Sequence, residues 1–224
     1  DNAKYILFVA NNASIGAVST CRMVRFAQGR KNGAKVVALD PRRSETAAKA
    51  DEWIQIRPGT DLAFMLALMK IMMEEGLYDA EFLKRHTNMP FLVHKDDQGE
   101  WQPVTDSEGH PLVVAEDTAE VRVLKTFTND NLKDVNDVTF LPGLTLSQPI
   151  VVEGRQVKTV FEAQLEELAE YTPEWAAEIT GVPAETIARI SREFGNTRPA
   201  IVDPGWDGGR FGNVNMRRRA QAMV

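Results

Sequence analysis

Short apolar runs alternate along this chain with stretches whose apolar residues recur at helical spacing. Four runs have the length and the aliphatic composition that are typical of buried parallel strands: Tyr5–Val9, Lys35–Leu39, Trp53–Ile56 and Ala200–Val202. Strands that alternate with helices indicate a parallel sheet covered by helices on both faces. We therefore predict an α/β fold, a three-layer Rossmann-like domain with a mainly parallel sheet.

Apolar residues at helical spacing predict the helices. The most regular helix is Asp61–Glu74, and the apolar residues near one face of it are Leu62, Met65, Leu66, Met69 and Met73. Capping residues mark helix ends, because Asp79 and Thr172 precede helical stretches, whereas Gly76 and Gly181 follow others. The remaining predicted helices are Ala17–Gln28, Ala80–His86, Val160–Tyr171, Pro173–Ile179, Pro183–Phe194 and Asn213–Val224.

Residues 91–157 differ in character from the rest of the chain. Glycines, prolines and acidic residues interrupt short alternating runs there, namely Leu112–Ala115, Val121–Leu124 and Ile150–Glu153. The sequence Glu153-Gly154-Arg155 between valine-rich runs predicts a hairpin. We therefore predict an α/β domain formed by residues 1–90 and 158–224, with an inserted lobe of hairpins and loops at residues 91–157. Such insertions usually tune access or partner binding, and no catalytic cluster is evident in this one.

Charged and polar residues directly follow two of the predicted strands. Asp40 comes immediately after the second strand, and Arg42 lies two residues further on. The third strand leads into Gly59, Thr60 and Asp61, of which Thr60 or Asp61 can cap the next helix. In open α/β sheets, ligands bind beyond the carboxyl ends of the strands. Carboxylates, arginines and helix N-termini together suit a nucleotide, whose hydroxyls and base amine need acceptors and whose phosphates need cations.

The turn after the first predicted strand carries Asn11, Asn12 and Ser14. Short polar side chains favour turns and tolerate unusual backbone angles. A fold that binds nicotinamide dinucleotides would have a G-x-G-x-x-G pattern here, whereas only Gly16 is present. The nicotinamide fingerprint is therefore absent. Two interpretations stay open, a turn that contacts another ligand and a polar turn with capping roles only.

A glycine-rich segment follows the last predicted strand. It contains Trp206, Gly208 and Gly209, and glycine allows the backbone to approach a ligand closely. The alternative is a plain loop that leads into the helix predicted at Asn213–Val224.

Composition excludes several classes of function. The 224 residues carry a net charge of −6, and the only tight cationic run, Arg217–Arg219, fits a solvated helix face, so we expect no nucleic-acid partner. No apolar stretch is long enough to span a bilayer. Cys21 is the only cysteine and the three histidines are scattered, so we predict no metal site. The first residue lies at the edge of a predicted strand and the last residues lie inside a predicted helix, so we expect the chain to be a segment of a longer protein.

The residues around Asp40 and Asp61 resemble a known family. The segments that carry the resemblance are YILFVANN, DPRRSETA, ADEWIQIRPGTD, EEGLYD and YTPEWAAEITGVPAETI. They are similar to the molybdopterin oxidoreductases of the dimethyl-sulfoxide-reductase type. The resemblance covers most of the chain apart from roughly residues 91–157.

This resemblance implies a molybdenum bis-(molybdopterin guanine dinucleotide) cofactor, with a 4Fe-4S cluster elsewhere in the parent protein. It implies that Asp40 and Asp61 face a guanine dinucleotide. It implies no catalytic residue and no metal ligand in this segment, because the family's protein-derived ligand precedes the first strand and Cys21 follows it. The cofactor-binding residues that we predict are Asn11, Asn12, Ser14, Asp40, Arg42, Gly59, Thr60, Asp61, Trp206, Gly208 and Gly209.

The segment RPAIVDPGWDGGRFGN and the long insertion look most similar to the catalytic subunits of tetrathionate, thiosulfate or polysulfide reductases of anaerobic respiration. Respiratory arsenate reductase is the competing interpretation within the family. The resemblance implies a periplasmic parent whose partners are the rest of the same polypeptide, a membrane anchor and an iron–sulfur electron-transfer subunit. We expect the segment alone to be inactive. A free-standing nucleotide-binding or interaction module is the alternative from a different class.

Overall fold

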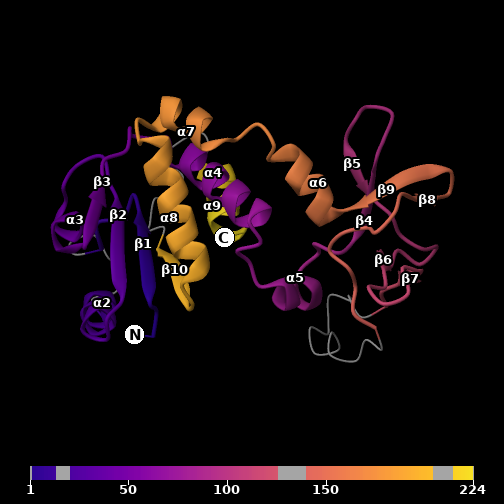
Figure 1. The fold of residues 1–224 in the computed structure, drawn as a ribbon, viewed down its shortest axis with the longest axis horizontal. Helices are drawn as coiled ribbons and strands as arrows, with labels where there is room; N and C mark the ends of the chain where they lie inside the picture. Colours follow the sequence, from indigo (N-terminus) through magenta and orange to yellow (C-terminus); the bar gives the residue numbers. More distant parts are fainter. Residues whose placement is uncertain (1, 14–20, 126–139, 204–213, 224) are drawn as a thin grey trace. The chain divides into compact units, whose positions relative to one another are not determined.

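The computed structural model describes residues 2–13, 21–125, 140–203 and 214–223 of the chain (Figure 1). The chain divides into two compact units. The first consists of Asp1–Tyr78 and Leu168–Val224, and the second of Asp79–Glu167. The second unit thus contains the segment 91–157 together with the helices that flank it.

The first unit is built on a four-stranded parallel sheet with the order β10-β1-β2-β3. Its strands are β1 (Tyr5–Val9), β2 (Lys35–Leu39), β3 (Glu52–Ile54) and β10 (Ala200–Asp203). The predicted parallel sheet is confirmed. The third strand ends earlier than predicted, at Ile54, because the backbone then leaves the sheet and the N–H of Arg57 donates to the carbonyl of Thr180 at 2.9 Å.

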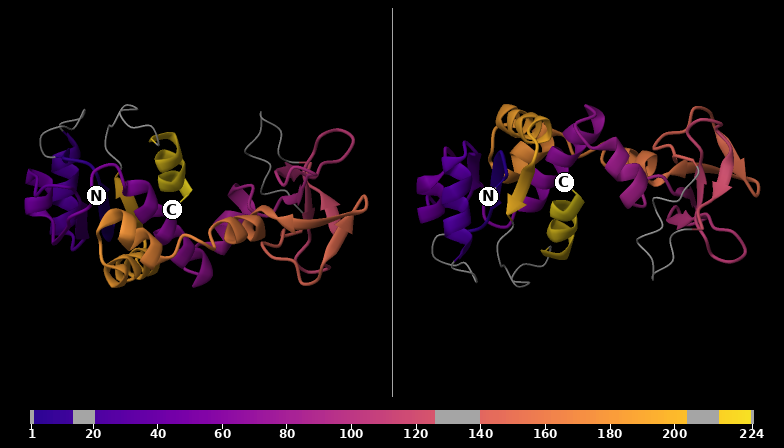
Figure 2. Two further views of the ribbon diagram at one scale, coloured as in Figure 1. Left: turned by 90° about the horizontal axis from the view of Figure 1, so that it is seen from above. Right: turned by 90° about the horizontal axis from the view of Figure 1, so that it is seen from below.

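Helices cover both faces of this sheet (Figure 1 and Figure 2). Side chains alternate along β1, so that Ile6 and Phe8 pack toward α2 (Cys21–Lys31) and α3 (Glu45–Lys49). Tyr5, Leu7 and Val9 belong to the core on the opposite face. The helices of that face are α4 (Asp61–Glu74), α7 (Pro173–Thr180), α8 (Ala184–Asn196) and α9 (Val214–Met223). The predicted three-layer α/β architecture is therefore confirmed.

Helix α4 has the bounds that its periodicity predicts, and Met65 and Met69 of the predicted apolar face are buried. The buried side of the helix is nevertheless broader than that face. Phe64 and Leu68 are fully buried, whereas Leu66 is only partly buried. The reason is that α4 packs against α7, α8 and α9 at once and so is buried on most of its sides. Such a helix has no single apolar stripe to read from the sequence.

The predicted capping roles of Asp79, Thr172 and Gly181 are confirmed. The side chain of Asp79 accepts from the N–H of Phe82 at the start of α5 (Ala80–His86), and Thr172 accepts from the N–H of Trp175 at the start of α7. Gly181 ends α7 in the left-handed region, with φ of 75°. Helix α6 (Val160–Glu167) is shorter than predicted, because the next residues form a turn in which the N–H of Tyr171 donates to the carbonyl of Leu168.

The second unit contains short antiparallel strands. They are β4 (Leu92–Lys95), β5 (Trp101–Pro103), β6 (Leu112–Val114), β7 (Val121–Val123), β8 (Ile150–Val152) and β9 (Arg155–Thr159), paired as β5-β4-β9-β8 and β6-β7. The predicted hairpin at Glu153 and Gly154 joins β8 to β9, and both residues have positive φ, as the type I′ form of a two-residue hairpin turn requires. Helices α5 and α6 (Val160–Glu167) complete this unit. Among the described helices, none combines the length and the hydropathy needed to span a bilayer.

Candidate nucleotide-binding site

The order of the parallel strands indicates where in the first unit a ligand could bind. Strand β1 pairs with β2 on one side and with β10 on the other, so the chain order reverses at β1. In open α/β sheets, ligands bind outside the carboxyl ends of the strands next to such a reversal. The polar residues that follow β1, β2 and β10 are therefore the first candidates for a binding site.

The turn after β1 is joined to the end of β10. Ala10 begins this turn with φ of 51°, in the left-handed region, and its N–H donates to the carbonyl of Leu39 at 3.0 Å. Asn11 is only 7% exposed, and its Nδ2 donates to Oδ1 of Asp203 at 2.7 Å. Asp203 was not among the predicted site residues. Its position directly after a valine, at the end of an apolar run as for Asp40, is the signal that could have identified it.

The same turn is joined on its other side to α3. Nδ2 of Asn12 donates to Oε2 of Glu45 at 2.7 Å, and Oγ1 of the fully buried Thr46 donates to Oδ1 of Asn12 at 3.0 Å. The hydrogen bond from Asn12 holds the pKa of Glu45 below its ordinary value. Both ends of the Asn12 amide are thus engaged within the protein.

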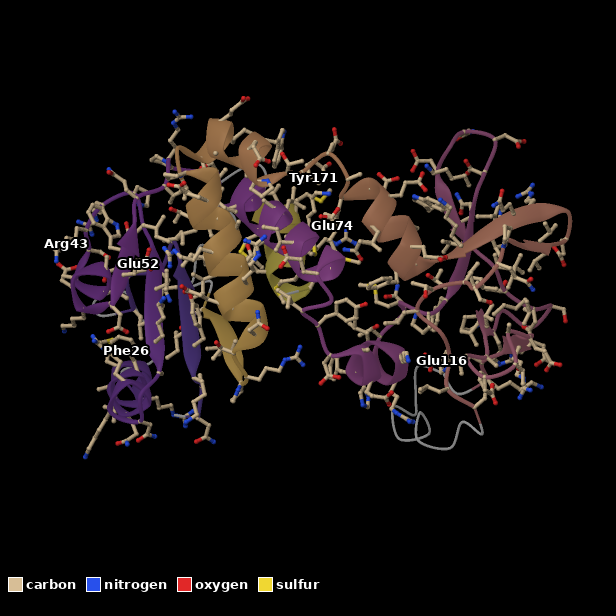
Figure 3. All side chains as sticks on the ribbon, in the orientation of Figure 1. Phe26, Arg43, Glu52, Glu74, Glu116 and Tyr171 are labelled. Carbon is tan, nitrogen blue, oxygen red and sulfur yellow. The ribbon has the colours of Figure 1, made fainter. Side chains whose placement is uncertain are left out.

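Asp40 organises the turn after β2. Its carboxylate, in a residue 8% exposed, accepts from the N–H of Arg42 at 3.0 Å and from Oγ of Ser44 at 2.6 Å. Ser44 in turn caps α3 by accepting from the N–H of Ala47. Asp40 therefore has the role of a turn former, although a carboxylate offers about four lone-pair sites and two bonds leave acceptor capacity. Arg43, which is labelled in Figure 3, is an exposed residue of the same turn.

The loop from β3 to α4 contains the other predicted site residues. Gly59 has φ of 80°, a backbone conformation that favours glycine. Thr60 occupies the N-cap position, but its hydroxyl donates to the carbonyl of Arg57 at 2.7 Å instead of capping the helix, so its predicted capping role is wrong. Asp61 is the first residue of α4 and is 4% exposed. A carboxylate in the first helical turn is favourable because the helix N-terminus is electropositive.

A groove of about 660 Å³ lies beside the edge strand β3. Its lining includes Trp53, Gln55, Arg57, Gly181 and Thr186. None of the predicted site residues that the structure describes lines it. The guanidinium of Arg57 donates to the carbonyl of Glu178 at the end of α7, which ties this loop to that helix.

Four of the predicted site residues lie outside the described residues, namely Ser14, Trp206, Gly208 and Gly209. In the described part of the chain, Asp106, Glu108 and His110 bring potential metal-ligating atoms within 4.8 Å of one another. Oδ1 of Asp106 accepts from the N–H groups of both Glu108 and His110, so this cluster is explained by the tight turn that it forms.

Comparison with known proteins identifies the family. Residues 1–213 match the family model described as molybdopterin oxidoreductase. The chain belongs to this family. It is 32% identical over 230 residues to the dimethyl sulfoxide reductase DmsA of Haemophilus influenzae, and this alignment covers 100% of the chain and 22% of that protein.

Two further relatives come from other members of the family. One subunit of the sulfite dehydrogenase of Allochromatium vinosum is 35% identical over 173 residues, which are 74% of the chain and 17% of that protein. The alpha subunit of the respiratory nitrate reductase of Haloferax mediterranei is 31% identical over 227 residues, which are 91% of the chain and 22% of that protein. The chain thus spans about a fifth of the length of these relatives.

A solved structure shows the same fold. Acetylene hydratase from Pelobacter acetylenicus superposes with a TM-score of 0.57 at 22% sequence identity, and the match covers 99% of this chain and 20% of that one. The predicted family is confirmed as the dimethyl-sulfoxide-reductase type. None of the relatives named here is a tetrathionate, thiosulfate or polysulfide reductase, so that finer prediction is not shown.

Proposed function

We propose that this chain is the part of a larger reductase catalytic subunit that binds one guanine dinucleotide of a molybdenum bis-(molybdopterin guanine dinucleotide) cofactor. The observation that carries this proposal is the convergence of Asn11, Asp40 and Asp203 at the carboxyl ends of β1, β2 and β10, where the strand order reverses. Membership of the molybdopterin oxidoreductase family supports the choice of cofactor.

The described residues fit such a ligand chemically. The carboxylate of Asp40 has acceptor capacity left for a ribose hydroxyl or a base amine, and Arg42 is an exposed cation in the same turn that can offset phosphate charge. Thr60 and Asp61 stand at the start of α4 and would hold the guanine edge. Each hydrogen bond to a charged group contributes about 1.5–3 kcal/mol to binding. A few such bonds hold a large cofactor firmly.

When bound, the cofactor supplies the redox chemistry, and the protein binds and orients it. The proposal includes the remaining parts that the family resemblance implies for the parent. These are a 4Fe-4S cluster outside this segment, a membrane anchor, an iron–sulfur electron-transfer subunit and a periplasmic location. The 224-residue chain alone should show no reductase activity, since we predict no metal ligand and no redox group in it.

The names of the relatives indicate a class of substrate. Relatives carry names that refer to dimethyl sulfoxide, sulfite and nitrate, and a further relative from Dechloromonas aromatica is named as the alpha subunit of a perchlorate reductase. Since the relatives named for dimethyl sulfoxide, nitrate and perchlorate are reductases, we propose a small oxygen-containing or sulfur-containing electron acceptor. Tetrathionate, thiosulfate or polysulfide stays our prediction within this class, with arsenate as the alternative. Membership of the family disfavours a free-standing regulatory module.

Exchanging Asp61 for Asn in the full-length protein tests the proposal. Asn keeps the size of the side chain but lacks the negative charge, so the variant should fold and yet carry less cofactor. The double variant with Asp40→Asn should carry still less. The measurements are the molybdenum content and the guanosine monophosphate that acid hydrolysis of the bound dinucleotide releases. Each lost acceptor leaves a buried donor of the ligand unpaired, which costs about 1–3 kcal/mol of binding.

Asp79→Asn is the matched control. Asp79 also stands at a helix start, where it accepts from the N–H of Phe82 in the second unit, and Asn retains that capping ability. This variant should keep the cofactor content of the unchanged protein. If Asp61→Asn and the double variant retain full cofactor and lose only thermal stability, these carboxylates are structural and the proposed contacts are wrong.

A further inference from the structure

Two asparagines of the candidate site each face a carboxylate from another element. Nδ2 of Asn11 donates to Asp203 at 2.7 Å, and Nδ2 of Asn12 donates to Glu45 at 2.7 Å. An ionised carboxylate accepts hydrogen bonds but cannot donate one. Each carboxylate therefore orients the amide with its nitrogen toward the carboxylate and its oxygen in another direction.

The two asparagines differ in what their amide oxygens do. At Asn12 the oxygen already accepts from Oγ1 of Thr46 at 3.0 Å, so this amide serves the turn itself. At Asn11, which is 7% exposed, the amide nitrogen is directed at Asp203 and the oxygen is turned away from it. Asn11 therefore presents an acceptor beside the point where the strand order reverses.

We infer that Asp203 is a positioning residue for the guanine dinucleotide. By accepting from Nδ2 of Asn11, it holds Oδ1 of Asn11 ready to accept from an N–H group of the dinucleotide. The two residues are 192 positions apart in the chain, so the pair also fixes the end of β10 against the turn after β1. This inference rests on the proposed function and deepens it, because it assigns a binding role to a residue that acts through Asn11.

A double-mutant cycle in the full-length, cofactor-loaded protein tests the inference. The readout is the rate at which purified protein loses the dinucleotide, followed as guanosine monophosphate after acid hydrolysis of the released cofactor. Asp203→Ala should raise this rate about tenfold, because the amide of Asn11 is no longer held in the binding orientation. In the Asn11→Ala background, Asp203→Ala should change the rate less than about twofold, because no amide is left to orient.

An exchange of the two side chains provides a rescue. In the double variant Asn11→Asp with Asp203→Asn, the amide at position 203 can donate to the carboxylate at position 11, whose second oxygen remains an acceptor for the ligand. The rate of cofactor loss should return to within about threefold of the unchanged protein. Asn11→Asp alone places two carboxylates against each other and should lose the cofactor fastest, since like charges at this distance repel.

Glu193→Gln is the structural control. Glu193 accepts from the hydroxyl of Tyr5 at the other end of β1, so this variant should lower the melting temperature and leave the rate of cofactor loss unchanged. Equal effects of Asp203→Ala in both backgrounds would overturn the inference, because Asp203 would then act without Asn11. So would an unchanged rate in Asp203→Ala. Absence of any guanine dinucleotide from the unchanged protein would instead refute the proposed function itself.

If Asp203→Ala does not fold, Asp203→Asn replaces it in the cycle. The substituted amide can accept from Asn11 or donate to it, so both orientations of the Asn11 amide become possible. The expected effect falls to about twofold to threefold and should again disappear in the Asn11→Ala background. Persistence of the effect in that background would contradict the positioning role.

Discussion

The two units of the chain are stabilised in different ways. In the α/β unit, the sheet lies between two helix layers, and several large side chains are fully buried on one of its faces, among them Leu7, Leu39, Phe64 and Leu68. In the second unit, one described cluster of buried residues consists of Leu92, Val114 and Val157, and Val113 and Phe161 are buried as well. Among the described residues, the first unit therefore has the larger apolar clusters.

Carboxylates accept hydrogen bonds in both units. Glu166 accepts from both Lys95 and Lys158, and the carboxylates of Asp96 and Asp106 accept from backbone N–H groups of their own turns. Asp40 in the α/β unit does the same with the N–H of Arg42. A carboxylate after a strand is therefore a poor sign of a ligand site by itself. The position of Asp40 next to the reversal of strand order is what distinguishes it from Asp96 and Asp106.

Truncation of one core residue in each unit should give the largest effects. Phe64→Ala should cost about 3–5 kcal/mol of stability and Leu92→Ala about 2–3 kcal/mol, because both side chains are fully buried but the core around Leu92 is smaller. Hydrogen exchange resolved along the chain measures the loss of protection in each unit separately. Equal losses for the two variants would contradict a larger apolar core around Phe64 than around Leu92.

Substitutions of two helical glycines test how tightly the α/β unit is packed. A Cβ at Gly195 of α8 would lie 2.7 Å from Cβ of Leu77, so Gly195→Ala should destabilise the unit by about 1–3 kcal/mol. Gly29 of α2 is the matched control, because the nearest atom to its Cβ would be 3.6 Å away, in ordinary contact. Gly29→Ala should stabilise by about 0.5–1 kcal/mol through helix propensity. Urea denaturation measures both changes, and the same sign for both would contradict this packing.

The smallest effect concerns the ion pairs of the second unit. Hydrogen bonds from Lys158 and Lys95 lower the pKa of Glu166 to about 2. Because the pKa is lower in the folded state, the stabilisation is fully present above the ordinary value of 4.5 and is lost as the pH falls toward 2. The side chain is 40% exposed, so solvent screening limits the contribution to less than about 1 kcal/mol.

Glu166→Gln should therefore lower the melting temperature slightly at pH 7, and the difference from the unchanged protein should shrink between pH 4.5 and pH 3. Raising the salt concentration at pH 7 should also reduce it. Thermal denaturation at several pH values and salt concentrations measures these changes. A difference that persists unchanged at pH 3 would mean that Glu166 stabilises the unit by packing rather than by charge.

Much of the fold could be predicted because local signals agree with the final structure. Alternating short apolar runs and helical stretches predicted the parallel strands, and residues such as Asp79, Thr172 and Gly181 predicted helix ends that the structure confirms. Predictions were wrong where contacts with other parts of the chain determine the bounds or the buried side of an element. The buried sides of α4 depend on three helices that pack around it, and the end of β3 depends on a hydrogen bond from Arg57 to Thr180.

In the candidate site, too, local signals predict some features, whereas others depend on distant parts of the chain. The pattern of residues predicts that polar residues follow the strands at Asn11 and Asp40, because strand ends and turns leave local signals in the sequence. The bonds of Asp40 to its own turn are local in the same sense, whereas the contact in which Asp203 accepts from Asn11 depends on the tertiary structure. The physical reason is that strand order brings together residues 192 positions apart, and no local preference of the chain specifies which distant strand will pair with β1.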